Sequence, residues 1–176
     1  MKKLSLQDLN RVSLQEFKEQ EKTPLVLVLD NIRSGLNVGS AFRTADAFSL
    51  EKIYLCGITA QPPHREILKT AIGATESMDW QYQESTLETI QQLKSNGYQI
   101  IAVEQADKST LLQEFNYQKG NKIALVFGNE VKGVSDEVME KIDACIEVPQ
   151  FGTKHSLNIS VCIGVVVWDL FKQIRY

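Results

Sequence analysis

The sequence has no excess of basic residues. Its 176 residues include 19 lysines and arginines against 22 aspartates and glutamates, which gives a formal net charge of −3 at pH 7. Proteins that coat nucleic acid without sequence preference depend on clustered lysine and arginine, because each contact has to neutralise a phosphate. The composition therefore argues against a non-specific nucleic-acid coat, and any nucleic-acid contact must be confined to one local surface.

Cysteine and histidine are also scarce. Cys56, Cys145 and Cys162 lie far apart without any C-x-x-C pair, and the two histidines are His64 and His155. Zinc sites are built from closely spaced cysteine and histidine ligands, so we expect no metal site. Each cysteine lies in an apolar run, which is typical of a buried free thiol.

Long hydrophobic runs are absent. The uncharged stretch from Ser156 to Trp168 is shorter than the ~20 apolar residues that a membrane span requires. The N-terminus carries lysines but lacks the unbroken apolar core of a signal peptide. We therefore expect no membrane insertion, no export and a cytoplasmic location.

Short apolar and β-branched runs alternate with helical segments along the chain. The alternation predicts six strands, at 24–30, 52–56, 78–82, 98–103, 122–128 and 144–149. Apolar residues that recur every three or four positions predict helices at 38–48, 65–72, 85–95 and 135–142. Because parallel strands need crossovers and crossovers are usually helical, we expect an α/β fold. Its sheet should be mostly parallel and covered by helices on both faces.

Both ends of the chain carry helical patterns. Ser13 and Glu16 have the spacing of a capping box, so residues 4–22 predict short helical decoration. We interpret residues 1–24 as a short N-terminal helical extension and residues 25–176 as one domain.

The C-terminal helix is apolar on every side from Val161 to Phe171, except for Gly164 and Asp169. A helix of this kind needs cover all round, which one face of a small sheet does not supply. We expect part of it to pack against a second subunit, with Trp168 and Phe171 as anchors. The alternative is a helix that is fully buried within a monomer.

The usual phosphate-binding loops of α/β proteins are missing. Gly128 and Gly133 have the spacing of a P-loop, but Val134 stands where a lysine must reach the phosphates. The other glycine pair, Gly35 and Gly39, has the wrong spacing for a dinucleotide fingerprint. A nucleoside triphosphatase and a nicotinamide dehydrogenase are therefore both disfavoured.

Three segments combine glycine with polar residues at predicted strand ends, where α/β proteins bind ligands. They are DNIRSGLNVGSAFRTADAF (30–48), FGNEVKGVS (127–135) and VPQFGTKHSLNIS (148–160). In this order they resemble the three motifs of the SpoU/TrmH branch of the SPOUT methyltransferases, and the resemblance covers residues 25–171.

The resemblance implies a fold that local patterns would not predict. Members of this branch have a C-terminal trefoil knot, which general rules of chain topology disfavour. They transfer a methyl group from S-adenosylmethionine (SAM) to an RNA ribose 2′-hydroxyl, without a metal, as homodimers with an active site at the subunit boundary. We therefore expect a knotted, SAM-dependent RNA 2′-O-methyltransferase that dimerises through its C-terminal helix.

The motif match assigns a catalytic role to five residues: Asn37 and Arg43 from the first motif, Glu130 from the second, and Ser156 and Asn158 from the third. Family accounts often make the arginine a general base, but free guanidinium loses its proton only above ~12. We favour stabilisation of the developing alkoxide by Arg43, with Glu130 as an acceptor for Arg43 or for backbone donors. Asn37 has an alternative reading as a helix N-cap.

The resemblance also implies which residues hold the cofactor. The segments expected around SAM are those at Val103, Gly128, Val148, Ser156 and Leu157. Asn129 stands where many relatives have a small residue or proline, which leaves the shape of that loop open. Gly128, Gly133 and Gly152 either allow the backbone to approach a ligand closely or are simple turn residues.

Basic residues cluster near the same predicted strand ends. The RNA-binding candidates are Arg33, Arg43, His64, Arg65, Lys69, Lys132 and Lys154, with His155 beside them; ordinary surface positions are the alternative for His64, Arg65 and Lys69. Relatives with a separate ribosomal-RNA-binding domain have a longer N-terminal region, which favours transfer RNA as the substrate. The competing function is a catalytically silent RNA-binding or assembly protein.

Overall fold

The computed structural model of the chain describes residues 1–5, 7–9 and 11–176. In these residues seven strands form one sheet in the order β3-β2-β1-β6-β4-β7-β5, and all neighbours run parallel. The strands are β1 (Thr23–Asp30), β2 (Leu50–Cys56), β3 (Trp80–Gln83), β4 (Tyr98–Val103), β5 (Thr110–Leu111), β6 (Lys122–Phe127) and β7 (Ala144–Glu147). All six predicted strands are confirmed, while β5 was missed because two residues carry no periodicity.

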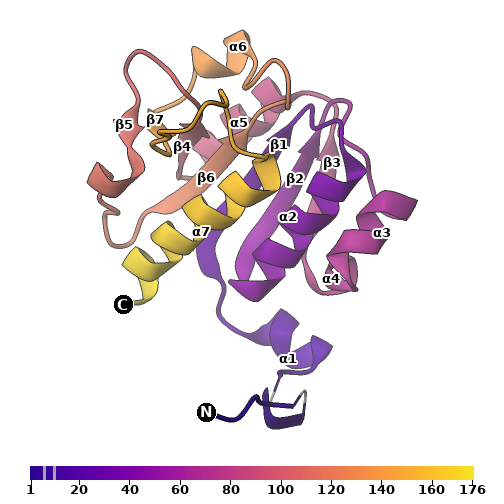
Figure 1. Cartoon of the computed structure of the whole chain (residues 1–176). Helices are drawn as coiled ribbons and strands as arrows, with labels where there is room; N and C mark the ends of the chain where they lie inside the picture. The colour runs from indigo at the N-terminus through magenta and orange to yellow at the C-terminus, as the bar shows by residue number, and fades with distance from the viewer. Residues whose placement is uncertain (6, 10) are drawn as a thin grey trace.

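Helices cover both faces of the sheet, as expected (Figure 1). They are α1 (Leu14–Glu19), α2 (Gly35–Ala47), α3 (Arg65–Ala71), α4 (Ala74–Ser77), α5 (Thr86–Ser95), α6 (Asp136–Met139) and α7 (Ile159–Arg175), with 3₁₀ turns η1 (Gln7–Leu9) and η2 (Leu112–Glu114). Helices α2, α3 and α7 contribute to one apolar core, and α5 and α6 to the core on the opposite face. The α/β class with a doubly covered parallel sheet is therefore confirmed, and the trefoil knot stays a prediction of the family resemblance.

The start of α2 differs from the expected start at Val38. The helix begins at Gly35, and its N-cap is Ser34, whose hydroxyl accepts a hydrogen bond from the Asn37 backbone N–H. The N-cap interpretation of Asn37 is therefore wrong. Because Ser34 takes the capping role, the Asn37 side chain is left free for long-range contacts.

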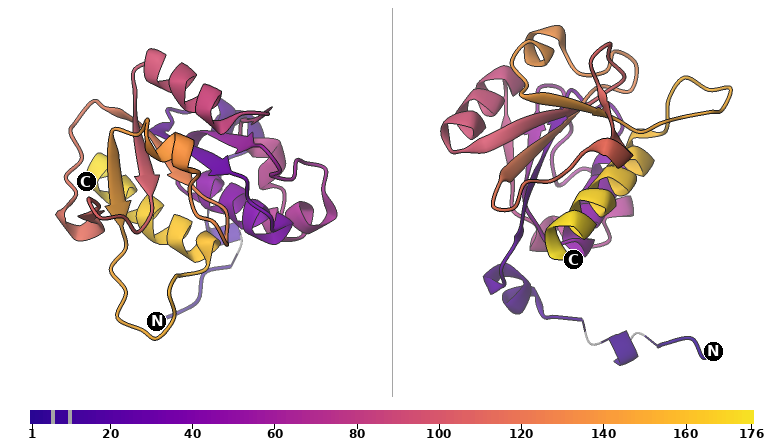
Figure 2. Two further views of the ribbon diagram at one scale, coloured as in Figure 1. Left: turned by 90° about the horizontal axis from the view of Figure 1, so that it is seen from above. Right: turned by 90° about the vertical axis from the view of Figure 1, so that its left-hand side faces the viewer.

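The N-terminal region contains η1 and α1 rather than one continuous helix. The capping box between Ser13 and Glu16 is present, with both reciprocal hydrogen bonds. Phe17 anchors α1 in the core, while the described residues 1–5 and 7–9 lie away from the sheet (Figure 2). The expectation of helical structure over residues 4–22 also includes Leu6 and Asn10, which lie outside the described residues.

Helix α7 buries one side and exposes another. Ile163, Val166, Val167 and Leu170 are buried in the core. Val161, Val165 and Trp168 are 51%, 40% and 49% exposed at spacings of four and three residues, so they form one continuous stripe. The fully buried alternative is therefore wrong for the single chain. No helix in the described part of the chain combines the length and apolarity that a bilayer span needs.

Candidate functional site

The carboxyl ends of the four central strands meet at one edge of the sheet. Phe127 of β6 is in register with Leu29 of β1 and with Val103 of β4, and Val103 is in register with Ile146 of β7. The loops that follow these strands therefore start side by side. They include most of the second and third motif segments and the start of the first.

The loop after β6 is held closed by its own backbone. A Cβ atom on Gly128 would lie 2.0 Å from backbone atoms of Gly133 and Val134, so only glycine permits this approach. Asn129 donates to the Asn31 carbonyl at 2.7 Å and accepts from the Val131 backbone N–H at 2.9 Å. The unusual residue in the second motif thus stabilises the loop. A Cβ on Gly152, by contrast, would meet nothing within 4 Å, which fits a simple turn residue.

Two carboxylates to which the motif match assigned no role hold this loop in place through hydrogen bonds. Asp30, at the end of β1, is 1% exposed and accepts from the Ser135 backbone N–H and hydroxyl, both at 2.9 Å, and from the Thr86 hydroxyl at 2.6 Å. Glu104, directly after β4, accepts from the Val134 backbone N–H at 3.0 Å. An acidic residue at the end of an apolar strand was the available sequence signal for both.

Glu130 lies at the N-terminus of α2, where backbone N–H groups lack helical partners. Its carboxylate accepts from the backbone N–H groups of Arg33 and Ser34 at 2.9 and 3.0 Å and from Asn37 Nδ2 at 2.9 Å. Asn158 Nδ2 in turn donates to Asn37 Oδ1 at 3.3 Å. Three of the five predicted catalytic residues are therefore linked directly across the three motifs.

This arrangement sets the charge state of Glu130. Partial burial alone would raise the pKa of the carboxyl group, but the hydrogen bonds from Arg33, Asn37 and Ser34 outweigh burial and lower the pKa below its ordinary value of 4.5. Glu130 is consequently ionised at neutral pH. The expected backbone donors are present, whereas the expected contact with Arg43 is not.

We expect Glu130→Gln to make the free energy of unfolding less dependent on pH. Because the folded-state pKa is depressed, the stabilisation from Glu130 is present above pH 4.5 and is lost as the pH falls through the folded-state value. Wild type should therefore exceed Glu130→Gln in stability at pH 7, and the gap should close in acid. Urea titrations at pH 7 and at pH 3.5 would measure both gaps, and a gap of constant size would contradict the assignment.

Two adjoining cavities lie between the loops. One, of about 110 Å³, is lined by Val103, Val148, Ser156 and Leu157 among others. The second, of about 490 Å³, is lined by Gly128, Asn129, Glu130, Ser156, Leu157 and Asn158 among others. They share Glu104, Gln105, Ser156, Leu157 and Cys162, and we call them together the strand-end cavity. All five residues expected around the cofactor line it.

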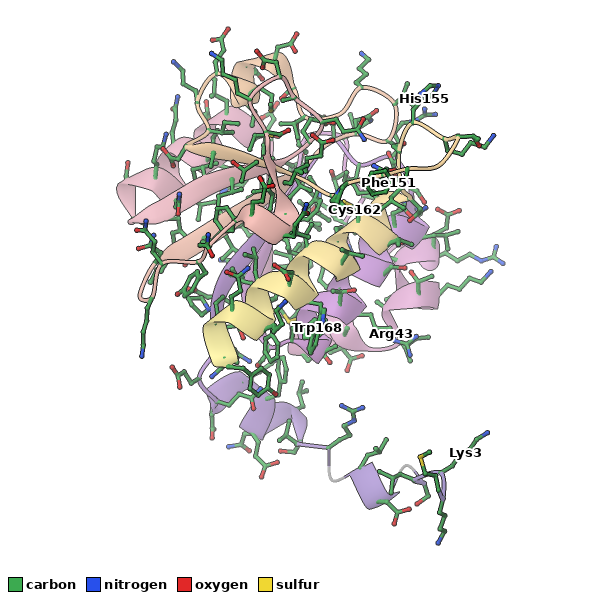
Figure 3. All side chains as sticks on the ribbon, turned by 60° about the vertical axis from the view of Figure 1, so that its left-hand side comes forward. Lys3, Arg43, Phe151, His155, Cys162 and Trp168 are labelled. Carbon is green, nitrogen blue, oxygen red and sulfur yellow. The ribbon has the colours of Figure 1, made fainter. Side chains whose placement is uncertain are left out.

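Arg43 does not reach this cavity. It lies about two turns beyond Gly35 on α2 and is exposed. It lines a different cavity of about 440 Å³, together with Phe48 and Lys69. Figure 3 shows its side chain pointing away from the loop that carries Phe151 and His155. Within one chain Arg43 therefore lies apart from the strand-end cavity, because α2 carries it about two turns away from the loops that form that cavity.

The other predicted RNA-binding residues are all exposed. His64, Arg65 and Lys69 lie at the start of α3 or along it, and α3 packs against α2 so tightly that a Cβ on Gly39 would lie 2.3 Å from the Ile67 carbonyl oxygen. Arg33 precedes α2, and Lys132 and Lys154 belong to the two loops that border the strand-end cavity. The basic residues thus form an α2–α3 group and a loop group.

The thiols offer no reactive group at the site. Cys56 and Cys145 are buried as expected, whereas Cys162 is only partly buried and lines the strand-end cavity. Burial raises the pKa of the Cys162 thiol to about 11, so it is protonated at neutral pH. Among the described residues, no group of three or more His, Cys, Asp or Glu is placed to hold a metal ion.

Proteins of similar sequence include two that are named as RNA 2′-O-methyltransferases. The chain is 32% identical over 166 residues to a tRNA (guanosine(18)-2′-O)-methyltransferase of Aquifex aeolicus, covering 91% of this chain and 74% of that protein. It is 30% identical over 165 residues to the 23S rRNA (guanosine-2′-O-)-methyltransferase RlmB of Neisseria meningitidis, covering 93% and 65%. Across such relatives it spans between 63% and 74% of their length.

A solved structure agrees with the fold. The crystal structure of an AdoMet-bound rRNA methyltransferase from Sinorhizobium meliloti has a TM-score of 0.81 at 25% identity, over 94% of this chain and 62% of that one. The family model for the SpoU rRNA Methylase family matches residues 24–168, which include all three motifs. That match spans most of the chain, and hydrogen bonds of Asn37 link the first motif to the second and third motifs, which line the strand-end cavity. The chain therefore belongs to the SpoU rRNA Methylase family.

Proposed function

We propose that this chain is a SAM-dependent methyltransferase that modifies an RNA ribose 2′-hydroxyl as a homodimer. The observation that carries the proposal is the link from Asn158 through Asn37 to Glu130 at the border of the strand-end cavity. Relatives named as tRNA and rRNA 2′-O-methyltransferases support the reaction type. A cytoplasmic location, where such RNA is found, goes with this proposal.

The strand-end cavity fits SAM in chemistry. SAM carries a sulfonium and an ammonium group against one carboxylate, so its net charge is positive. The described residues that line the cavity include Glu104, Glu130 and Glu147 but no lysine or arginine. Val103, Val148 and Leu157 add apolar wall for a flat base. The AdoMet-bound neighbour supports the same cofactor, and no residue set for a metal is part of the proposal.

Catalysis by these residues is mainly positioning. When bound, SAM supplies an electrophilic methyl group, and the ribose hydroxyl must be held in line with it. Asn37 and Asn158 orient partners without adding charge, and Ser156 offers a hydroxyl at the cavity wall. The alkoxide that develops on the ribose needs a nearby cation. Within one chain the exposed Arg43 is too far along α2 to supply it.

A second copy of the chain would supply the missing cation. The stripe of Val161, Val165 and Trp168 leaves apolar surface exposed on α7, and α2 packs beside α7 through Phe48, which contacts Trp168 at a ring distance of 5.9 Å. Arg43 shares a cavity wall with Phe48, so it lies next to this stripe. We propose that a two-fold interface through α7 carries Arg43 to the strand-end cavity of the partner subunit, where the ionised Glu130 attracts it.

The direct test is methyl transfer to separate pools of transfer RNA and ribosomal RNA with methyl-labelled SAM. Nuclease digestion and mass spectrometry would then identify 2′-O-methylated nucleosides. Label in transfer RNA is the expected result, which the relative named as a tRNA (guanosine(18)-2′-O)-methyltransferase supports. Binding of SAM without label in either pool would instead indicate a catalytically silent RNA-binding protein. If a deletion strain keeps every ribose methyl group of the wild-type RNA, RNA methylation is excluded as the cellular role.

Leu157→Pro should weaken SAM binding by about tenfold or more, since it removes a backbone N–H and restricts the chain at the wall of both cavities. Isothermal titration calorimetry with SAM would measure the loss. Thr153→Pro is the matched control, because it lies in the same loop but does not line the cavity. Equal affinities in the two variants would move the cofactor site away from Leu157.

A further inference from the structure

The loop between β7 and α7, residues 148–158, projects from the body of the molecule (Figure 2). Phe151 is 97% exposed near its tip, and residues 151–158 are all exposed. No hydrogen bond joins the side chains at positions 149–156 to any other residue that the structure describes. An aromatic ring left in water on such a loop does not contribute to the core, so it is available to a ligand.

Some residues of this loop line the strand-end cavity, and others do not. Val148, Gln150, Ser156 and Leu157 line the strand-end cavity, whereas Phe151 does not. Phe151 follows Gln150 directly, so its backbone adjoins the part of the loop that lines the cavity. A ligand group that contacts Phe151 is therefore held beside the proposed methyl-donor site.

The surroundings of Phe151 are basic. Lys154 and His155 lie in the same loop, and Figure 3 places both Phe151 and His155 on it. His155 and Val131 line the same cavity, so the loop after β6, which carries the exposed Lys132, faces this one. An exposed aromatic ring among cationic side chains is the combination that binds single-stranded nucleic acid, in which bases stack and phosphates pair with lysine.

We propose that Phe151 is a stacking platform for an unpaired nucleobase that flanks the methylated nucleotide, with Lys132 and Lys154 holding its phosphates. This inference rests on the proposed function and adds a specificity residue outside the three motif positions. A second copy of the chain is a less suitable occupant, because symmetric pairing of this loop would bring Lys154 near its own copy. Stacking against the adenine of SAM is the other alternative, and the test separates it.

The test compares wild type with three substitutions at Phe151. The probe is a fluorescein-labelled single-stranded RNA of about 12 nucleotides, within the usual site size of such surfaces, titrated by anisotropy at one salt concentration. We expect Phe151→Ala to weaken binding about 5- to 150-fold, the range for loss of one stacked base. Phe151→Trp should bind as wild type does, and Phe151→Leu, which is apolar but not aromatic, should resemble Phe151→Ala.

Three controls make the result specific. Tyr176→Leu removes another aromatic side chain that is 93% exposed, at the far end of α7, and should leave RNA affinity unchanged. Calorimetry should show equal SAM affinity in Phe151→Ala and wild type, and light scattering should show equal mass. The melting temperature should also stay unchanged, since the ring is exposed.

Several outcomes would overturn the inference. They are wild-type RNA affinity in Phe151→Leu, a loss of SAM affinity as large as the loss of RNA affinity, a change of oligomeric state, or no binding of the probe by wild type. None of these outcomes would contradict the proposed function. That function fails only if wild type transfers no methyl group to any RNA pool. An active enzyme with a dispensable Phe151 would remove the stacking platform alone.

Discussion

Arg43→Ala is expected to lower kcat for methyl transfer by about 10²–10³-fold, the usual effect of removing one group that stabilises a developing oxyanion. SAM affinity should stay near the wild-type value, because Arg43 is proposed to lie at the ribose hydroxyl beside Glu130 and not at SAM itself. Single-turnover kinetics with labelled SAM and calorimetry would measure the two quantities. Arg43→Lys is the matched control: it keeps the charge but loses the planar guanidinium, so partial activity is expected.

A mixing experiment tests whether Arg43 acts across the subunit boundary. Homodimers of Arg43→Ala and of Leu157→Pro should each show little activity at a SAM concentration that saturates wild type but not Leu157→Pro. In a mixed dimer, the intact pocket of the first variant would meet the intact Arg43 of the second. Random exchange of subunits at equal concentrations should then restore about a quarter of wild-type activity, because half the dimers are mixed and each has one complete site. Complete absence of recovery, once mass spectrometry has shown mixed dimers, would place Arg43 and the pocket in the same subunit.

Trp168→Glu is expected to convert a dimer into a monomer with little activity. Trp168 is 49% exposed in the single chain and belongs to the stripe with Val161 and Val165. Burial of an unpaired carboxylate in an apolar interface costs several kcal/mol, which is enough to separate the subunits at micromolar concentration. Light scattering should show wild type near twice the mass of one chain and the variant near the mass of one.

A charge on the other side of the molecule is the matched control. Gln91 is exposed on α5, which covers the opposite face of the sheet, so Gln91→Glu should remain dimeric and active. Trp168→Glu should keep its fold, because Ile163, Val166 and Leu170 still bury the inner side of α7. Monomeric wild type, or a dimeric and active Trp168→Glu, would remove α7 from the interface.

The fold class followed from local patterns. The runs at 24–30 and 122–128 are apolar on both faces, as strands buried between two helical layers must be, and both became central strands. The Ser13–Glu16 spacing correctly predicted a capping box because both partners lie within one helical turn. The three motif segments predicted the edge at which the site lies, since polar residues follow buried strands there.

Contacts across the chain could not be predicted in the same way. Asp30 and Ser135 are 105 positions apart, and Asn37 and Asn158 are 121 apart. Local periodicity contains no information on such pairs, because it depends on neighbours within a few turns. The role of Asp30 and Glu104 in fixing the loop after β6 therefore became visible only from hydrogen-bond geometry.

The sequence by itself determined six of the seven described strands, the layer arrangement and the family, because apolar periodicity and three ordered motifs are local features of the chain. Only the tertiary structure decided which side of each element faces the site. Ser34 rather than Asn37 caps α2, so the Asn37 side chain is free to bind Glu130. Arg43 lines a different cavity from the strand-end cavity of its own chain. Successive helical residues point ~100° apart, so only the orientation of α2 in the folded chain decides that Asn37 and Arg43 face different surroundings.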